Sequence, residues 1–375
     1  MNYILVALIA ISQLIIFPGL SFRWAKEVSA QLLIVASLSW LIWKKNKWLS
    51  MFIMWCLILF MSTKSLVIKD DANGVQFNIN VFTLLNMLNI ILYGIFYYIL
   101  REIKIDRKLI YKTFCFVGIF QAVYVILQCL QIDQFFFHIG EQPGVIKRWG
   151  VGLWANEALV SWCIAICSPF FLAFKELRFK IGYWVCFIAL LFTRCSTGII
   201  GFIFGGLFWL YFKNKRLAII ITITLLLICL GMIASGKFAY YFNEPHRFKI
   251  WAKTLQIWKG APLTGWGLGS YRQLFQQLAP EFSSSGHWAQ AHNEYIQILF
   301  ETGIIGFGLF MALIFTTILK FIRNRVGIIP FTSLLIFGLV ALTGFPLHTA
   351  HGVLVIMALV LYERQNECQD EEVIL

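Results

Sequence analysis

The sequence predicts an all-α integral membrane protein with about twelve transmembrane helices. Hydrophobic residues make up 60% of the 375 residues and charged residues only 13%, whereas a soluble domain carries about 25% charged residues. Apolar runs of about 17–25 residues, long enough to cross about 30 Å of hydrocarbon as a helix, recur along the whole chain. The alternation over about ten residues that marks a strand of a membrane β-barrel does not occur. We therefore expect one polytopic membrane domain covering residues 1–375.

The apolar runs give the expected bounds of each span. They are residues 3–20, 28–43, 49–66, 80–100, 109–131, 155–174, 180–193, 196–213, 217–234, 294–319, 328–344 and 351–362. The runs 180–193 and 351–362 are short, so each either re-enters the membrane from one side or extends into flanking residues. The first run lacks the basic start and A-x-A cleavage site of a signal peptide, so we expect it to remain as the first helix.

Basic residues favour an orientation with both termini in the cytoplasm, because cytoplasmic loops are enriched in Lys and Arg. They cluster in every second loop and in the C-terminal tail: Lys44, Lys45, Lys47, Arg101, Lys104, Arg107, Lys108, Lys175, Arg178, Lys180, Lys213, Lys215, Arg216, Lys320, Arg323, Arg325 and Arg364. This distribution accounts for the formal charge of +13 without a nucleic-acid partner. It makes 363–375 a cytoplasmic tail and 235–292 a large, partly helical periplasmic loop before the tenth span.

Cysteine and histidine are the residues that would reveal a metal site. The nine cysteines lie mostly in apolar runs without CxxC spacing, so we interpret them as small core hydrophobes. All six histidines lie in or beside outer segments: His138, His246, His287, His292, His348 and His351. Zinc binding by His287, His292, His348 and His351 is an alternative, but their spacing matches no known ligand pattern. We predict neither a metal nor a cofactor.

The long outer loop begins with a predicted helix from Pro245 to about Lys259. Phe248, Trp251, Leu255 and Trp258 follow helical spacing and form one apolar stripe beside basic residues. Such a helix either lies on the lipid interface or turns Arg247 into the protein. The passage GAPLTGWGLGSY follows, and it does not have the strand context of a nucleotide-binding loop. We expect Gly265, Gly267 and Gly269 to permit a tight backbone path, with backbone N–H groups as an alternative anion site.

Four residues form a basic set at the outer face. Arg194 interrupts two apolar runs, where a charge is usually functional unless it snorkels to the interface. Arg148 precedes the sixth span, which Asn156 enters from outside. His292 precedes the tenth span and is either a proton acceptor for a hydroxyl or an ordinary interfacial histidine. Together with Arg247, these residues could bind a lipid headgroup that carries phosphate, because one arginine can donate hydrogen bonds to two phosphate oxygens at once.

Several motifs resemble the bacterial O-antigen ligase superfamily, which includes O-antigen ligases, O-antigen polymerases and O-linked oligosaccharyltransferases. The best matches are Arg247…Trp251…Pro262-Leu263-Thr264-Gly265-Trp266-Gly267, Ala291-His292-Asn293-Glu294-Tyr295 and Glu301-Thr302-Gly303-Ile304-Ile305-Gly306. Arg148-Trp149-Gly150 with Asn156, and Thr193-Arg194-Cys195-Ser196-Thr197-Gly198, match more weakly. Thr193 and Ala155 stand where members often have Ser and Pro.

The resemblance implies metal-independent glycosyl transfer at the periplasmic face of the bacterial inner membrane. The implied donor is a glycan on undecaprenyl diphosphate, and the implied acceptor is a hydroxyl of a glycolipid or glycan, foremost the lipid A core. The implied catalytic residues are His292, Arg247 and Arg194. The implied substrate-binding residues are Arg148, Asn156, Trp251, Gly265, Gly267, Asn293 and Tyr295. Alternatives are a polymerase with the same donor chemistry, protein O-glycosylation and, from another class, a lipid-linked glycan transporter.

Overall fold

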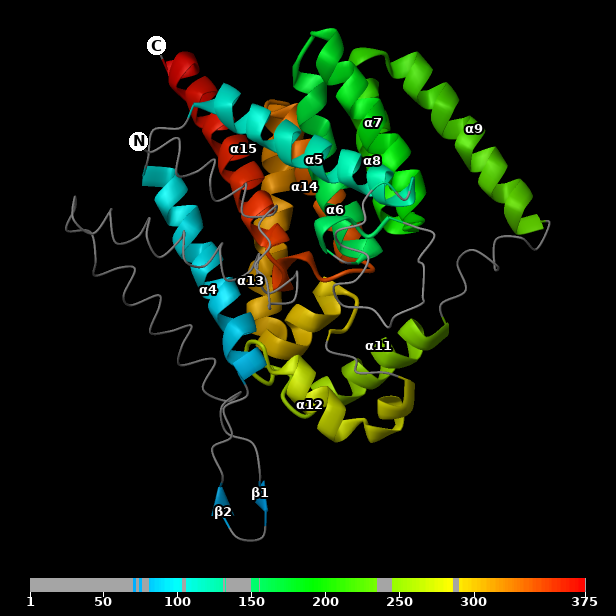
Figure 1. Cartoon of the computed structure of the whole chain (residues 1–375). Helices are drawn as coiled ribbons and strands as arrows, with labels where there is room; N and C mark the ends of the chain where they lie inside the picture. Colours follow the sequence, from blue (N-terminus) through cyan, green and yellow to red (C-terminus); the bar gives the residue numbers. More distant parts are fainter. Residues whose placement is uncertain are drawn as a thin grey trace.

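The computed structural model in Figure 1 confirms the prediction of an all-α protein. It describes residues 70–71, 74–75, 81–102, 106–130, 132, 150–154, 156–234, 245–285 and 290–374. In this part the strands are β1 (Asp70–Asp71) and β2 (Gly74–Val75), a short antiparallel pair. The first three expected spans lie outside the described residues, as do Arg148, His138 and His287.

All nine apolar runs predicted between residues 80 and 362 coincide with helices. The helices of the bundle are α4 (Val81–Glu102), α5 (Arg107–Cys129), α6 (Glu157–Cys167), α7 (Leu177–Thr193), α8 (Ser196–Lys213), α9 (Lys215–Ala234), α13 (Glu294–Asn324), α14 (Ile328–Ala341) and α15 (His351–Ile374). The outer loop contains α11 (Pro245–Trp258) and α12 (Tyr271–Leu278), and short 3₁₀ turns are η3 (Gly152–Trp154), η4 (Ser168–Ala173), η5 (Pro280–Ser285) and η6 (Pro346–His348).

Among the described helices, three are long and apolar enough to cross a membrane by themselves. They are α5, α8 and α13, while α14 and α6 continued by η4 are shorter apolar helices. The full count of twelve spans stays a prediction. The two short runs extend into flanking residues, since α7 begins at Leu177 and α15 continues to Ile374.

The core of the bundle is built around α6, whose residues from Leu159 to Cys167 are all buried. A helix that is apolar on every side belongs in such a position. It packs against α5, α7, α8, α14 and α15, and the stacked rings of Phe114 and Phe170, 3.9 Å between centroids, join α5 to η4. The buried free thiols of Cys115, Cys163, Cys167 and Cys186 lie in this core, which confirms them as core hydrophobes.

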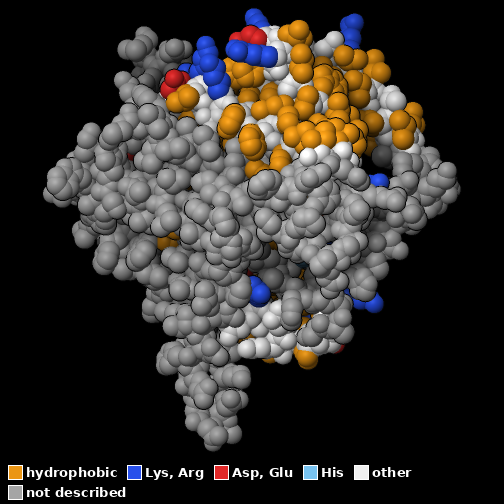
Figure 2. All heavy atoms as spheres, in the orientation of Figure 1, with side chains coloured by type: hydrophobic (Ala, Val, Ile, Leu, Met, Phe, Trp, Pro, Cys, Tyr) orange, Lys and Arg blue, Asp and Glu red, His pale blue; other side chains and the backbone are white. Residues whose placement is uncertain are grey.

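The two ends of the bundle carry different segments of the chain. At one end Arg101 Nη1 lies 3.1 Å from Glu363 Oε2 and Arg364 donates to the carbonyl of Leu100. Figure 2 shows Lys and Arg side chains at this end, above a broad band of apolar side chains. At the opposite end lie α11 and α12 (Figure 1). The chain therefore has a basic end and an end that carries the large outer loop.

Candidate active site

A break in α13 builds the floor of the candidate site. Gly303 has φ 65° and ψ −170°, which interrupts the helix. The backbone groups released there pair with the passage GAPLTGWGLGSY, residues 260–271, which we call the glycine loop. Trp266 N donates to Phe300 O (3.0 Å), Gly267 N to Glu301 O (2.8 Å), Ile304 N to Pro262 O (2.9 Å) and Ile305 N to Leu263 O (3.2 Å). Buried backbone groups require such partners. The glycine loop therefore fills the break in α13.

Two glycines make this close approach possible. A Cβ on Gly265 would lie 2.5 Å from the carbonyl carbon of Glu301, and one on Gly303 would lie 2.3 Å from Leu263 O. Both residues, and Gly267 at φ 103°, adopt positive φ, where a side chain is strained. This confirms the tight backbone path predicted for the loop. The N–H groups of Gly265 and Gly267 already donate to Ala261 O and Glu301 O, so a substrate contact by either glycine stays a prediction.

The turn between α14 and α15, residues 342–350, collects the predicted site residues. Arg247 Nη1 donates to Thr343 O at 3.1 Å, and Asn293 Nδ2 donates to Leu342 O at 3.0 Å. The ring of His292 meets the ring of Phe345 edge to face, 5.1 Å between centroids. We call residues 342–350 the α14–α15 turn. It brings Arg247 from α11 and His292 from the start of α13 to one place.

His292 lies in a strained and partly buried position. Its φ is 52°, a left-handed conformation that disfavours a side chain. Burial, and then the positive charge of Arg247, lower the pKa of His292 from 6.5 to about 4. The imidazole is therefore neutral at pH 7, and a neutral imidazole has one nitrogen that can accept a proton.

Residues on both sides of His292 are fixed by hydrogen bonds. Ala291 accepts from Trp251 Nε1 through its carbonyl at 2.8 Å. The N–H of Ala291 donates to Gln297 Oε1 at 2.9 Å. Asn293 caps α13 by accepting from Ile296 N at 3.0 Å. The predicted residues Trp251 and Asn293 therefore hold His292 in place, and any contact they make with a substrate stays a prediction.

Tyr295 links the start of α13 to α14. Its hydroxyl donates to Gly338 O at 3.0 Å. A direct role of Tyr295 in substrate binding stays a prediction.

Arg194 lies at the same end of the bundle as Arg247. It ends α7 in a left-handed conformation, φ 56°, with an exposed side chain. Thr197, three residues later, shares a 2.8 Å hydrogen bond with the hydroxyl of Thr343 in the α14–α15 turn. The structure thus brings the start of α8 to the turn that holds Arg247.

Asn156 and the segment after Arg148 lie at the edge of this region. Asn156 caps α6 by accepting from the N–H groups of Ala158 and Leu159, both at 3.0 Å. Gly150, two residues after Arg148, donates to the carbonyl of Phe192 at 3.2 Å, two residues before Arg194. The observed role of Asn156 is therefore structural, and a contact with substrate stays a prediction.

The four residues of the predicted apolar stripe on α11 differ in their exposure. Phe248 is 66% exposed and Leu255 is 36% exposed, whereas Ile250 and Thr254 are fully buried. The helix packs against α12 and α13 through a face that also directs Arg247 toward Thr343. Of the two alternatives for Arg247, the structure therefore supports the inward-pointing one.

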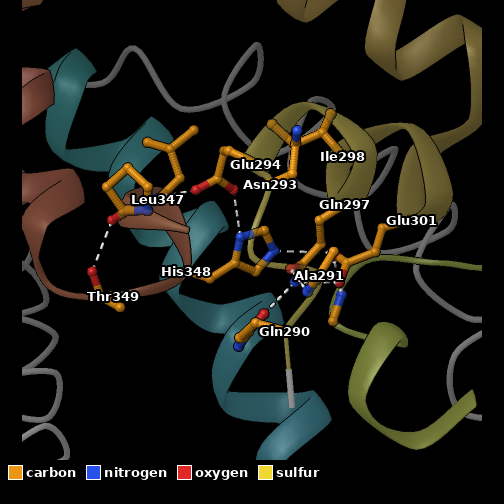
Figure 3. Close-up of polar contacts among 12 residues, drawn as sticks. Gln290, Ala291, Asn293, Glu294, Gln297, Ile298, Glu301, Leu347, His348 and Thr349 are labelled. Carbon is orange, nitrogen blue, oxygen red and sulfur yellow. Dashed lines mark hydrogen bonds and ion pairs between the residues drawn. The ribbon is translucent and has the colours of Figure 1, made fainter. Parts of the chain in front are cut away.

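A buried cluster of Glu294, Glu301 and His348 was not predicted from the sequence. The imidazole of His348 lies between the two carboxylates, with Nδ1 2.5 Å from Glu294 Oε1 and Nε2 3.2 Å from Glu301 Oε2 (Figure 3). Burial lowers the pKa of His348, but the two carboxylates outweigh it and raise that pKa to about 10. Glu294 and Glu301 are seven residues apart, which places both on one face of a helix. This spacing is the sequence signal from which a pair of neighbouring carboxylates could have been predicted.

The described residues contain no group of three or more His, Cys, Asp or Glu side chains arranged to hold a metal ion. His348 engages two carboxylates, and His351 contacts the hydroxyl of Thr349 at 2.6 Å and Leu159 O at 2.8 Å. His287, another residue of the zinc alternative, lies outside the described part of the chain.

A cavity of about 660 Å³ runs beside α13. Its outer end is bounded by Thr264, Leu268 and the Glu294–His348 pair, and it reaches Ile318 and Phe331 deep in the bundle. Most of its walls are apolar side chains of α13, α14 and α15. The cavity can therefore accommodate a hydrocarbon chain that lies along α13.

The fold and this site define a multi-pass helical membrane protein whose candidate site residues gather at one end of the bundle. Residues 181–311, roughly a third of the chain, match the sequence profile of the O-antigen ligase family. The matched segment runs from α7 past the break in α13 and includes Arg194, Arg247 and His292. It confirms the resemblance to the O-antigen ligase superfamily, whose members are glycosyltransferases of the ligase or polymerase type. A search of curated proteins found no significant match.

Proposed function

We propose that this protein transfers a glycan from undecaprenyl diphosphate to an acceptor hydroxyl at the periplasmic face of the bacterial inner membrane. The observation that carries the proposal is the pairing of Arg247 with His292. A permanent cation and a neutral imidazole are held on the same α14–α15 turn. The family match of residues 181–311 supports the reaction class.

The proposed reaction needs a cation and a proton acceptor. The acceptor oxygen attacks the anomeric carbon of the glycan, and the bond between that carbon and the diphosphate oxygen breaks. The electron pair of this bond leaves with the diphosphate, where Arg247 and Arg194 meet the growing negative charge. The hydroxyl proton goes to His292. Because arginines stabilise the leaving group, the proposed reaction uses neither a metal ion nor a cofactor.

The low pKa of His292 links proton transfer to donor binding. With a pKa of about 4, the imidazole of the unliganded protein is a weak base. A bound diphosphate offsets the charge of Arg247, which is the second cause of the lowered pKa. The pKa of His292 then rises, although burial still holds it below 6.5. His292 thus becomes a better proton acceptor when the donor is in place.

The remaining predicted residues surround this pair. We propose that the cavity beside α13 holds part of the polyprenyl chain, since its walls are mostly apolar and Thr264 and Leu268 of the outer loop line one end. Arg148 and Asn156 are proposed to contact the donor. Trp251, Asn293 and Tyr295 hold the segment around His292, and membrane lipid surrounds the bundle.

Purified protein in lipid nanodiscs tests the proposal. It is incubated with an undecaprenyl-diphosphate glycan and either a lipid A core acceptor or a second lipid-linked glycan. Release of undecaprenyl diphosphate together with glycosylated lipid A core supports the ligase. Lengthening of the glycan on its carrier instead identifies a polymerase with the same chemistry. Translocation of the lipid-linked glycan without any transfer contradicts the proposal.

A further inference from the structure

The Glu294–His348–Glu301 cluster is closed to outside ligands. All three side chains are at most 1% exposed. Every carboxylate oxygen accepts a hydrogen bond: besides the two contacts with His348, Glu294 Oε2 accepts from Leu347 N at 2.8 Å, Glu301 Oε2 from Gly269 N at 2.9 Å and Glu301 Oε1 from Gln297 Nε2 at 3.2 Å. Although the cluster borders the cavity, its polar atoms are used within the protein (Figure 3).

We propose that His348 is a positioning residue for glycan transfer, which locks the α14–α15 turn to α13 and so holds His292 and Arg247 in register. The inference rests on the proposed function of the site. It assigns to His348 no contact with the reacting atoms.

The first support is the set of segments that meet at His348. Its ring belongs to the α14–α15 turn, Glu294 and Glu301 belong to α13, and Glu301 also accepts from the glycine loop at Gly269. The cluster therefore ties together the three segments that surround His292.

The second support is the short path from His348 to the predicted catalytic residues. Thr343, which accepts from Arg247, and Phe345, which contacts His292, precede His348 by five and three residues in the same turn. Glu294 follows His292 by two residues. A shift of this turn along α13 would move Arg247 and His292 relative to each other.

The third support is the charge of the cluster. With its pKa near 10, His348 carries a positive charge between two buried carboxylates at neutral pH. Removing one partner from a buried charged group leaves the others uncompensated, which is strongly unfavourable. A neutral residue at 348 would therefore loosen the turn even where its shape fits.

The experiment compares His348→Gln with His351→Gln. His351 is a matched control because it is equally buried and makes two hydrogen bonds in the same region, but it contacts neither glutamate. For each variant the kcat and the donor KM of glycan transfer are measured in nanodiscs, together with the Tm. We expect His348→Gln to lower kcat by about 10- to 100-fold, because misplacement by about 1 Å has this effect, with KM nearly unchanged. His351→Gln should lower the Tm but leave kcat within about threefold of wild type.

Glu301→Gln provides a second, milder variant. It weakens the longer of the two contacts with His348, so we expect a smaller loss of kcat with the same unchanged KM. Such a graded loss is what positioning predicts.

Three results would overturn the inference. The first is a wild-type kcat in folded His348→Gln. The second is an effect confined to the donor KM, which would make His348 a binding residue. The third is a failure of both His348→Gln and Glu301→Gln to fold, which would make the cluster a requirement of the fold. Failure of the wild-type protein to release undecaprenyl diphosphate would instead refute the proposed function, so the two failures are distinguishable.

Discussion

At the scale of single residues, the environment of His292 determines how activity should depend on pH. The proposed proton acceptor must be neutral, and its pKa is lowered from 6.5 to about 4 by burial and by Arg247. We therefore expect kcat/KM, which reports the free enzyme, to stay level from pH 7 to about 5. It should fall about tenfold per pH unit below 4. Rates of glycan transfer measured across this range provide the test.

The variant Arg247→Gln serves as the control for this profile. It removes the charge of Arg247, the second cause of the lowered pKa of His292, and leaves the burial of His292 in place. The pH at which its residual activity falls on the acid side should therefore be higher than in the wild type but still below 6.5. An acid limb near 6.5 in the wild-type protein would mean that His292 is exposed during turnover, against the present account.

At the scale of structural elements, the sequence identified the helices but not the break in α13. Residues 294–319 were expected as one uninterrupted span because the run ETGIIGFG remains apolar around Gly303. The break depends on the glycine loop, about 40 residues earlier in the chain, which pairs with the released backbone groups. On α11 the fully buried residues Ile250 and Thr254 lie outside the predicted stripe, because packing against α12 and α13 selects them.

The break itself gives a prediction for Gly303→Ala. A Cβ at this position would lie 2.3 Å from Leu263 O at a φ of 65°, so the variant should lose more than about 1 kcal/mol of stability. Gly308→Ala, in the same helix, is the matched control because a Cβ there meets nothing within 4 Å, and its stability should change by no more than about 1 kcal/mol. Thermal unfolding in detergent compares the two variants. Equal Tm values would show that the glycine loop does not need its close contact with α13.

The candidate site was only partly predictable from the sequence. Arg194, Arg247 and His292 were found because charged and titratable groups are rare in apolar chains. The hydrogen bond from Asn293 to Leu342 and the pairing of His348 with two glutamates join residues about 50 positions apart. Such long-range contacts leave no local pattern in a single sequence.

At the scale of the whole molecule, the clusters of Lys and Arg in every second short loop predict the orientation in the membrane. In a variant without native cysteines, Lys249→Cys on α11 should react with a membrane-impermeant maleimide added to the periplasmic side of the membrane. Lys215→Cys at the start of α9 should react only after permeabilisation, because cytoplasmic loops collect basic residues. Both side chains are exposed, so burial does not affect the comparison. The reverse labelling pattern would place the candidate site in the cytoplasm and contradict the orientation.

The central claim is that Arg247 binds the diphosphate while His292 accepts the proton. The most direct measurement follows the binding and the turnover of radiolabelled undecaprenyl-diphosphate glycan in Arg247→Ala and His292→Ala. Lys249→Ala is the control, because its exposed side chain lies two residues from Arg247. We predict that His292→Ala binds the donor but does not transfer the glycan. Arg247→Ala should bind the donor weakly and transfer the glycan only at a residual rate, and Lys249→Ala should retain both properties. Full transfer by either His292→Ala or Arg247→Ala would contradict the central claim.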